Sequence, residues 1–517
     1  MYRTDDEGGH MALNARILGL STAILLVSGC VSVPAEDALS GIDTPTGWAA
    51  VSAEMATDAK PVTENWLADL HDPVITLLVA EAIEGNTNLA AAEARVRATR
   101  ERVGITRAAV LPTVNGALSG RTAKTPASSR LNSNNQVVVV PETTTEDFNL
   151  GFNLSWELDI WGRLTDQTRA AYLGAEAAKL DLASTELSIA GGTAQAFYAL
   201  TEARLQRQLS ERDVQTGESN LSIIERRYNR GISSSLDVRL ARSSLASSRA
   251  TLVARQRTEQ EAARRLEFLL GRYPSAAIAS AEALPMLDGF WGDGSVAVGD
   301  PLSLLATRPD VIAAERRLKA AGLNAAAARK ALLPSLSLSG SAFEQEFEAS
   351  NISFDLSDAA QSLTANLVQP LFQGGRLRAQ ARAAKADMEA VVFDYAGTVL
   401  TAYQEVENAL AAERFLTAQL EAQSLAFEEA KAAEELTQRQ YLSGTTNIFN
   451  LISAQQRRIS AESQYISASR QRLSNRIDLY LALGASFEVP DVTTTAIGPG
   501  NAQIVSQMTP DQKGDRS

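Results

Sequence analysis

The side chains that most often do chemistry in proteins are scarce in this chain of 517 residues. It contains one cysteine, Cys30, and two histidines, His10 and His71. One cysteine cannot form a disulfide within the chain, and this set cannot build a Cys/His metal cluster. No nucleophile–histidine pairing, phosphate-binding loop or paired-carboxylate motif stands in a usable context. The chemistry-bearing residues therefore predict no enzyme, no metal site and no bound cofactor.

The overall composition narrows the class further. Hydrophobic residues make up 45% and charged residues 21%, which is typical of a chain that folds. The net charge of −13 argues against a nucleic-acid-binding surface, which would be basic. Aromatic residues make up only 6%, which is a low fraction for a chain with one large globular core.

The cysteine follows a segment that predicts targeting. Residues 17–27 form an apolar run that is preceded by Arg16 and is too short to span a bilayer. The run ends in Leu26-Val27-Ser28-Gly29-Cys30, which resembles the bacterial lipobox, whose cysteine is acylated. We therefore predict a covalent lipid on Cys30, and Val31 after it favours the outer membrane. A chance cysteine at the end of a plain signal peptide is the alternative.

The translation start is open within this segment. The acidic residues 5–7 do not suit the positive start of a signal peptide, so Met11 is an alternative first residue. With either start, residues 1–29 are predicted to be the signal peptide.

The body of the chain is an internal duplication. Comparing the chain with itself gives an offset near 213 residues, at which Tyr228, Gly231 and Asp237 align with Tyr441, Gly444 and Asn450. Several landmarks in one order indicate a duplicated unit. We predict six segments, which are a signal peptide at 1–29, a lipid-anchored segment at 30–72, a first repeat at 73–272, a linker at 273–300, a second repeat at 301–484 and a disordered tail at 485–517.

Each repeat is predicted to contain a long helical hairpin. No proline occurs from 142 to 273 or from 371 to 489, and both stretches are rich in Ala, Leu, Glu, Gln and Arg. Arg163 to Tyr228 could form about 100 Å of helix at roughly 1.5 Å per residue. Gly191-Gly192 and Gly217 are places where this helix could bend or break. Such hairpins bury little apolar surface alone, so they should pack into a bundle or tube.

Each repeat also carries two predicted strands. Apolar and polar residues alternate without a break from 148 to 160, which is enough to cross a bilayer as a tilted strand. Phe152, Leu154 and Trp156 are predicted to be on the lipid-facing side. The hairpins are predicted at about 113–160 and about 335–371, with polar loops at about 121–147 and 344–361. Four strands cannot close a membrane barrel alone, so several chains must share one.

Three stretches carry a resemblance to a known family. They are Trp156-Glu157-Leu158-Asp159-Ile160-Trp161-Gly162-Arg163-Leu164, Arg308-Pro309-Asp310-Val311, and Pro370-Leu371-Phe372-Gln373-Gly374-Gly375-Arg376. Together they are similar to the TolC-like outer-membrane factors, in the lipoprotein efflux-channel branch of the OprM and NodT types. The resemblance runs from about Trp66 to Gly484.

The resemblance implies a mainly α-helical fold with a membrane β-barrel. Three chains would form a homotrimer, and each chain would contribute four strands to one twelve-stranded barrel. The long hairpins would form a periplasmic helical tube. It implies a passive exit duct for drugs or other small molecules in the outer membrane. An inner-membrane pump and a periplasmic adaptor would be its partners, and outer-membrane lipid would surround it.

The same resemblance places the functional end at the two helix–helix turns near Gly231 and Gly444. It implies contacts with the adaptor or tip roles for six residues: Gly231, Ser234, Leu236, Gly444, Thr446 and Phe449. It implies a gate or constriction at Asp237, Asn450 and Ser453, of which only Asp237 is acidic. Asp237 could instead only stabilise a helix start. Five arginines flank the first turn and could be solvated faces or adaptor contacts: Arg226, Arg227, Arg230, Arg239 and Arg242.

Other function classes remain as alternatives. The outer-membrane duct of a type I protein secretion system would share these features. A structural coiled-coil periplasmic lipoprotein would explain the helices but not residues 148–160. A secreted enzyme would explain none of the features.

Overall fold

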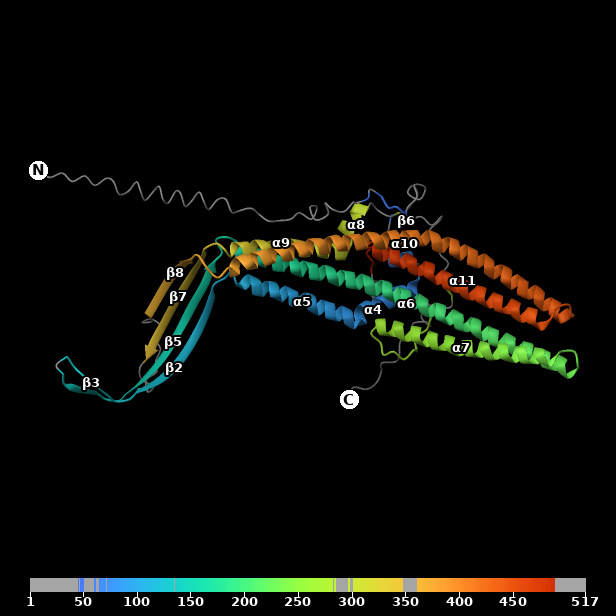
Figure 1. Cartoon of the computed structure of the whole chain (residues 1–517), viewed down its shortest axis with the longest axis horizontal. Helices are drawn as coiled ribbons and strands as arrows, with labels where there is room; N and C mark the ends of the chain where they lie inside the picture. The colour runs from blue at the N-terminus through green and yellow to red at the C-terminus, as the bar shows by residue number, and fades with distance from the viewer. Residues whose placement is uncertain are drawn as a thin grey trace. The chain divides into compact units, whose positions relative to one another are not determined.

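The computed structural model describes residues 45, 47–50, 60–61, 65–70, 72–133, 135–281, 283–284, 296–297, 301–346 and 360–488. Cys30, the predicted signal peptide and the tail beyond residue 488 lie outside the described residues. Figure 1 shows the elements, which are β1 (Lys60–Pro61), α3 (Trp66–Asp69), α4 (Pro73–Gly85), α5 (Thr87–Ala108), β2 (Thr113–Thr125), β3 (Ser128–Leu131), β4 (Val137–Val140), β5 (Thr143–Leu158), α6 (Arg163–Asn229), α7 (Ser235–Leu269), β6 (Val296–Ala297), α8 (Pro301–Thr307), α9 (Pro309–Lys330), β7 (Ser335–Glu346), β8 (Ala360–Val368), α10 (Arg376–Ser443) and α11 (Ile448–Ala482).

The order of elements occurs twice. A helix of 22 residues, two long strands, a very long helix and a helix of 35 residues follow one another as α5, β2, β5, α6 and α7, and again as α9, β7, β8, α10 and α11. The very long helices have 67 and 68 residues. The proline-free stretches thus form helical hairpins, as predicted.

The chain divides into two compact units, which we describe separately. Among the described residues, the first unit contains Ala98–Glu176 and Glu315–Tyr395, and it holds the sheet of long strands. The second contains Ile42–Arg97, Ala177–Ala314 and the chain from Ala396 onward, and it holds most of the helical residues.

The sheet of the first unit is antiparallel throughout, in the order β2-β5-β7-β8 (Figure 1). Its central strand β5 spans Thr143–Leu158 and contains nearly all of the predicted alternation. Ile160 is an exception, because the strand ends at Leu158 and Ile160 lies in the turn before α6.

The predicted polar loop at 121–147 is wrong. Strand β2 continues to Thr125, β5 begins at Thr143, and β3 pairs with β4 in a small hairpin of its own. Most of these residues are exposed, so the strands are held by backbone pairing rather than by an apolar face. The predicted loop at 344–361 is shorter than expected at both described ends, because β7 reaches Glu346 and β8 starts at Ala360.

Helix α6 is continuous through the glycines that could have interrupted it. At Gly191 an added Cβ would lie 2.5 Å from a methyl carbon of Leu481 on α11. At Gly217 it would lie 3.3 Å from the side chain of Leu245 on α7. These glycines therefore permit close helix packing rather than a break.

The largest apolar core of the second unit lies where α3 and α4 pack on the long helices. Trp66 is fully buried and stacks on Tyr480 of α11 with ring centroids 5.9 Å apart. Phe197 and Tyr198 of α6 and Leu266 of α7 belong to the same cluster. Aromatic residues from three segments of this unit thus meet in one core.

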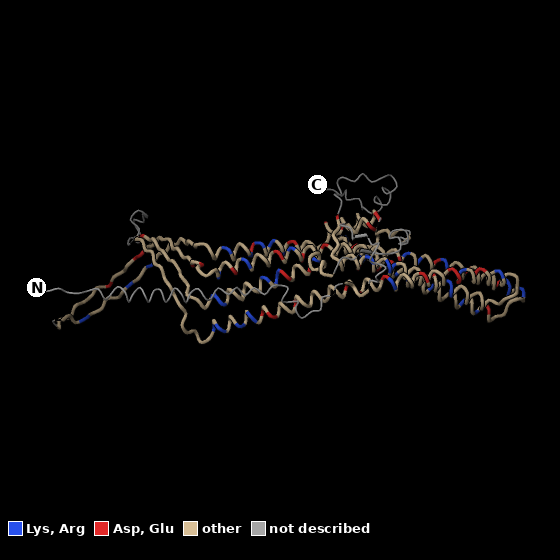
Figure 2. The backbone as a smooth tube through the Cα atoms, turned by 90° about the horizontal axis from the view of Figure 1, so that it is seen from above, with Lys and Arg blue, Asp and Glu red and all other residues tan. Residues whose placement is uncertain are grey.

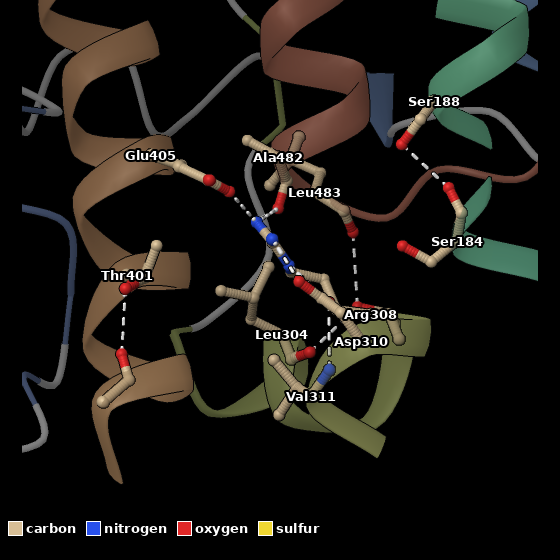
Figure 3. Close-up of polar contacts among 12 residues, drawn as sticks. Ser184, Ser188, Leu304, Arg308, Asp310, Val311, Thr401, Glu405, Ala482 and Leu483 are labelled. Atoms are coloured by element: carbon tan, nitrogen blue, oxygen red, sulfur yellow. Dashed lines mark hydrogen bonds and ion pairs between the residues drawn. The ribbon is translucent and has the colours of Figure 1, made fainter. Parts of the chain in front are cut away.

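Arg308, at the junction of α8 and α9, fastens three helices of this unit together (Figure 3). Its side chain is 8% exposed and forms ion pairs of 2.6 Å with Asp310 and with Glu405 of α10. It also donates a 2.9 Å hydrogen bond to the carbonyl of Ala482 at the end of α11. Burial by itself would raise the pKa of the Asp310 carboxyl, but the hydrogen bonds and charge of Arg308 outweigh it and hold that pKa below its ordinary value.

Candidate functional site: the two helix–helix turns

The first turn joins α6 to α7 within the second unit. Gly231 has a φ of +74°, a left-handed conformation that glycine adopts at little cost. The amide of Ile232 donates a 2.9 Å hydrogen bond back to the carbonyl of Arg227, and the Gly231 amide donates to Tyr228 at the same distance. These bonds satisfy carbonyl groups that the end of α6 leaves without partners.

The start of α7 is closed by a reciprocal cap. The hydroxyl of Ser234 accepts a 3.2 Å hydrogen bond from the Asp237 amide, and the Asp237 carboxylate accepts a 2.8 Å bond from the Ser234 amide. This is a capping box, and it places a negative charge at the positive end of the helix. Asp237 is therefore a helix-stabilising residue, and this role leaves a contribution to a gate open.

The second turn joins α10 to α11 with the same backbone plan. Gly444 has a φ of +78°, and the Thr445 amide donates a 2.9 Å bond to the Gln440 carbonyl. Asn447 caps α11 by accepting a 3.0 Å bond from the amide of Asn450. The side-chain amide of Asn450 donates a 3.0 Å bond to the hydroxyl of Thr446.

The two turns share one small core. Ile224, Val238 and Ala241 from the first hairpin pack with Tyr441, Ile448 and Leu451 from the second. The guanidinium of Arg227 lies 5.1 Å from the centroid of the Tyr441 ring, within range of a cation–π contact. Figure 1 shows both turns at the same end of the helices of this unit. The structure thus brings together the two turns that the sequence repeat paired.

Other predicted residues of this end lie outside the caps. Leu236 and Phe449 occupy equivalent positions in the two turns, and each is 62% exposed. Ser453 is half-buried one helical turn beyond Asn450 and takes no part in the cap.

Partners within the chain account for several of the flanking arginines. Arg242 forms a 2.7 Å ion pair with Glu225, Arg226 donates to the hydroxyl of Ser222, and Arg227 covers Tyr441. Arg230 and Arg239 are exposed. For Arg226 and Arg242, the interpretation as ordinary helix-surface residues is sufficient, whereas Arg227 takes part in the contact between the two hairpins.

The residues predicted to face lipid share one side of β5. Phe152, Leu154 and Trp156 alternate with Asn153 and Ser155, and Phe152 is 43% exposed. The indole of Trp156 donates a 2.9 Å hydrogen bond to the carbonyl of Val110.

Two anchoring contacts were missed by sequence reasoning. The indole of Trp161 donates a 2.6 Å bond to the Pro334 carbonyl, and Lys330 forms a 2.5 Å ion pair with Asp166 at the start of α6. Trp156 holds the helix-to-strand turn of the first repeat and Trp161 holds that of the second. The paired Leu-Pro motifs at 111–112 and 333–334 were the available signal.

Among the described helices, none combines the length and apolar character that a membrane-crossing helix needs.

Comparisons with known proteins agree with this architecture. Residues 78–272 and 301–485 match the family described as outer membrane efflux protein. The pyoverdine export outer membrane protein OpmQ of Pseudomonas putida is 29% identical over 465 residues, which cover 88% of this chain and 94% of that protein. The antibiotic efflux pump outer membrane protein ArpC of Pseudomonas putida is 28% identical over 91% of this chain and 96% of its own.

A solved structure shows the same likeness. The outer-membrane channel OprN aligns with a TM-score of 0.74 at 27% identity, covering 86% of this chain and 98% of that one. The chain therefore belongs to the outer membrane efflux protein family, and it is a passive channel of the outer membrane rather than an enzyme.

Proposed function

We propose that three copies of this chain assemble into one exit duct of a tripartite efflux system for small molecules. An inner-membrane pump would drive transport, and a periplasmic adaptor would join the pump to the duct. The observation that carries assembly from several copies is the open sheet of the first unit.

The sheet has two edges that a membrane would not tolerate. Within the described residues, β2 and β8 each pair with one strand of the sheet, so each has a free edge. Lipid cannot satisfy the backbone groups of a free edge, so a sheet in a bilayer must close into a barrel. Four strands are too few, because about eight is the lower limit.

The direction of the strands fits closure by identical copies. With four strands that are antiparallel at every step, β2 and β8 run in opposite directions. The β8 edge of one copy can therefore pair antiparallel with the β2 edge of the next. Three copies of four strands give twelve, an even number as antiparallel barrels of this kind require.

The relatives favour small molecules over proteins as cargo. OpmQ is named for pyoverdine export and ArpC for antibiotic efflux. The type I secretion alternative would predict loss of a secreted protein, rather than accumulation of small toxic compounds, when the gene is deleted. Drug susceptibility and the secreted proteome of a deletion strain separate the two.

The two turns at the helix ends are the proposed contact with the adaptor. Exposed apolar side chains at equivalent positions, Leu236 and Phe449, suit a protein partner. Asp237 would contribute three copies of a carboxylate at the mouth of a trimer, and Asn450 and Ser453 would line a neutral constriction there.

We also propose that Cys30 carries the lipid anchor. A multiply acylated cysteine would bind the membrane firmly, at about 0.8 kcal/mol for each buried CH₂. Intact mass of the purified chain should show the acyl groups and a mature start at Cys30, and Cys30→Ser should lack them. The barrel should still retain that variant in the membrane, and its complete release would argue against the barrel.

Engineered disulfides test the trimer. Thr364→Cys on β8 is combined in turn with Asn115→Cys, Ala117→Cys or Ser119→Cys on β2, all on one side of the sheet. Oxidation should link three chains in at least one combination, as seen by electrophoresis without reductant.

The control pairs Thr364→Cys with Asn149→Cys on the internal strand β5, which should give no linked chains. If all three edge combinations stay monomeric, or if they form an open-ended ladder, closure by three copies is wrong.

A further inference from the structure

The two faces of the sheet in the first unit differ in a way that bears on cargo. On one face, every residue of β5 from Phe148 to Leu158 is apolar, and the partners of Leu154, Trp156 and Leu158 in register on β2, β7 and β8 are Val, Leu, Ala or Gly. Toward the other end of the same face, polar residues stand beside the apolar ones: Glu346 pairs with Phe148, Glu344 with Leu150 and Gln361 with Ala342. This face carries Val114, Leu118, Phe152, Leu363 and Leu367, which are each between 43% and 70% exposed. An apolar band on one face is what lipid requires, so the other face turns toward the lumen.

The opposite face is polar but almost without charge. One row across the four strands consists of Thr113, Ser155, Ser339 and Thr364. The next row consists of Asn115, Asn153, Ser341 and Ser362, with a 2.8 Å hydrogen bond between the two serine hydroxyls. Two large apolar side chains, Phe343 and Val368, share this face in the described part of the sheet.

In the part of the sheet that the structure describes, charged side chains occur on this face only at the ends of the band, and each faces an opposite charge. At one end Glu157 accepts hydrogen bonds of 2.7 and 2.9 Å from Arg163. At the other end Arg121 lies opposite Asp147 in the register of β2 and β5. Figure 2 shows the strands as mostly uncharged, whereas blue and red segments recur along the helices.

We infer that the lumen of the membrane segment is a charge-neutral lining of hydroxyl and amide groups, which passes anionic, cationic and uncharged polar solutes without sorting them. This inference rests on the proposed function, in which the polar face lines a barrel. Hydroxyl and amide groups both donate and accept hydrogen bonds, so they wet the lumen for solutes of either sign. A lining without net fixed charge has no field that concentrates one sign of solute.

Such a lining does not enrich solutes of one charge in the lumen. A wall with one sign of charge would raise the local concentration of the opposite ion by about 10–10³-fold. The compensated pairs at both ends of the band avoid this enrichment. The duct would therefore suit a pump whose substrates differ in charge.

Cysteine labelling from outside the cell tests the inference. Ser339→Cys lies on the polar face, and Leu338→Cys is a matched control on the apolar face, one residue away. Each is treated with a methanethiosulfonate that carries either a trimethylammonium or a sulfonate group. Rates are divided by those of the same reagents with a free thiol in solution. The parent chain, whose only cysteine is Cys30, gives the background.

Ser339→Cys should react with both reagents, and the two normalised rates should agree within about twofold. A difference of about tenfold or more, the size expected of a charged wall, would overturn the neutral lining. Leu338→Cys should react with neither reagent. If it reacts as fast as Ser339→Cys, the barrel of the proposed function is wrong, which is a separate failure.

A third variant shows that the assay can detect charge. Adding Asn153→Asp to Ser339→Cys places a carboxylate diagonally across from the thiol on the same face. The cationic reagent should then react several-fold faster than the anionic one. If this variant leaves the ratio unchanged, the polar face does not line a confined lumen and the inference fails.

Discussion

The two helix–helix turns have one backbone conformation and two different cap chemistries. Both contain a glycine in the left-handed region, with φ of +74° at Gly231 and +78° at Gly444. In both, a backbone amide donates a 2.9 Å hydrogen bond to the carbonyl five residues earlier. In both, a side chain caps the start of the next helix. The cap of the first turn is a charged, reciprocal Ser234–Asp237 box, whereas that of the second is a neutral Asn447–Asn450 pair.

The difference shows which features a duplicated hairpin must keep. The left-handed residue and the capped helix start satisfy backbone groups that a reversal between two helices leaves without partners, and both turns retain them. The charge of the cap is not required for reversal, so Asp237 and Asn450 could diverge. In a trimer, negative charge at this end would therefore come from the first turn more than from the second.

The largest expected effect comes from the shared conformation. Gly231→Val and Gly444→Val should each destabilise their turn by about 1–2 kcal/mol, because a side chain is strained in the left-handed region. No atom lies within 4 Å of an added Cβ at either glycine, so the cost is strain rather than collision. Proteolysis at the turns should increase and export should fall, while membrane yield stays near the parent level.

Asparagine variants at the same positions serve as the control. Asparagine tolerates the left-handed region better than other residues, so Gly231→Asn and Gly444→Asn should be milder than the valine variants. If one glycine accepts valine without loss and the other does not, the two turns are not conformationally equivalent.

The sequence predicts these turns because their signals are local. A glycine followed by a capping residue a few positions later is enough, and the repeat supplies a second example. The central strand β5 was predicted for the same reason, since its alternation lies within one segment. By contrast, β3 and β4 and the outer part of β2 have little apolar alternation, and only backbone pairing across the sheet defines them.

Contacts between distant segments could not be predicted. Trp161 meets the carbonyl of Pro334, and Arg308 meets Glu405 and Ala482, so each contact depends on the arrangement of whole helices. The sequence marked Trp161 and Arg308 as parts of family motifs but could not say what they touch. The shared core below the turns, including the contact of Arg227 with Tyr441, is of the same kind.

A second prediction exchanges the cap chemistry between the turns. Asp237→Asn should remove a charge that favours the start of α7, at a cost of about 0.3–1 kcal/mol. Asn450→Asp should add the corresponding charge to α11. In the proposed trimer, the first variant should reduce the preference of the channel for cations and the second should increase it.

Reversal potentials in a salt gradient measure this preference. The double variant Asp237→Asn with Asn450→Asp should return toward the parent, because the number of carboxylates at the mouth is restored. If the reversal potential does not change in any of the three variants, these residues do not border the conducting path, and their role is restricted to capping.

The smallest expected effect distinguishes the two tyrosines that precede the turns. Tyr441 is 6% exposed in the shared core, whereas Tyr228 at the equivalent position is 47% exposed. Burial raises the pKa of Tyr441 above its ordinary value of 10.0, although the nearby charge of Arg227 opposes this, and Asp237 raises it further. The packing of the second turn therefore favours the neutral phenol of Tyr441. The charged residues that shift the pKa of this phenol, Arg227 and Asp237, belong to the first turn.

The sign of the pH dependence follows from this raised pKa. The neutral phenol is favoured in the folded state, so its contribution to stability is complete below about pH 10 and is lost as the pH rises through the folded-state pKa. Heat stability of the parent should therefore fall more steeply above pH 10 than that of Tyr441→Phe, which has no phenol to ionise at this position. Tyr228→Phe, the matched change outside the shared core, should keep the parent profile. If Tyr228→Phe removes the loss of heat stability above pH 10 and Tyr441→Phe does not, ionisation of the exposed Tyr228 causes that loss. The two turns would then not share the core described above.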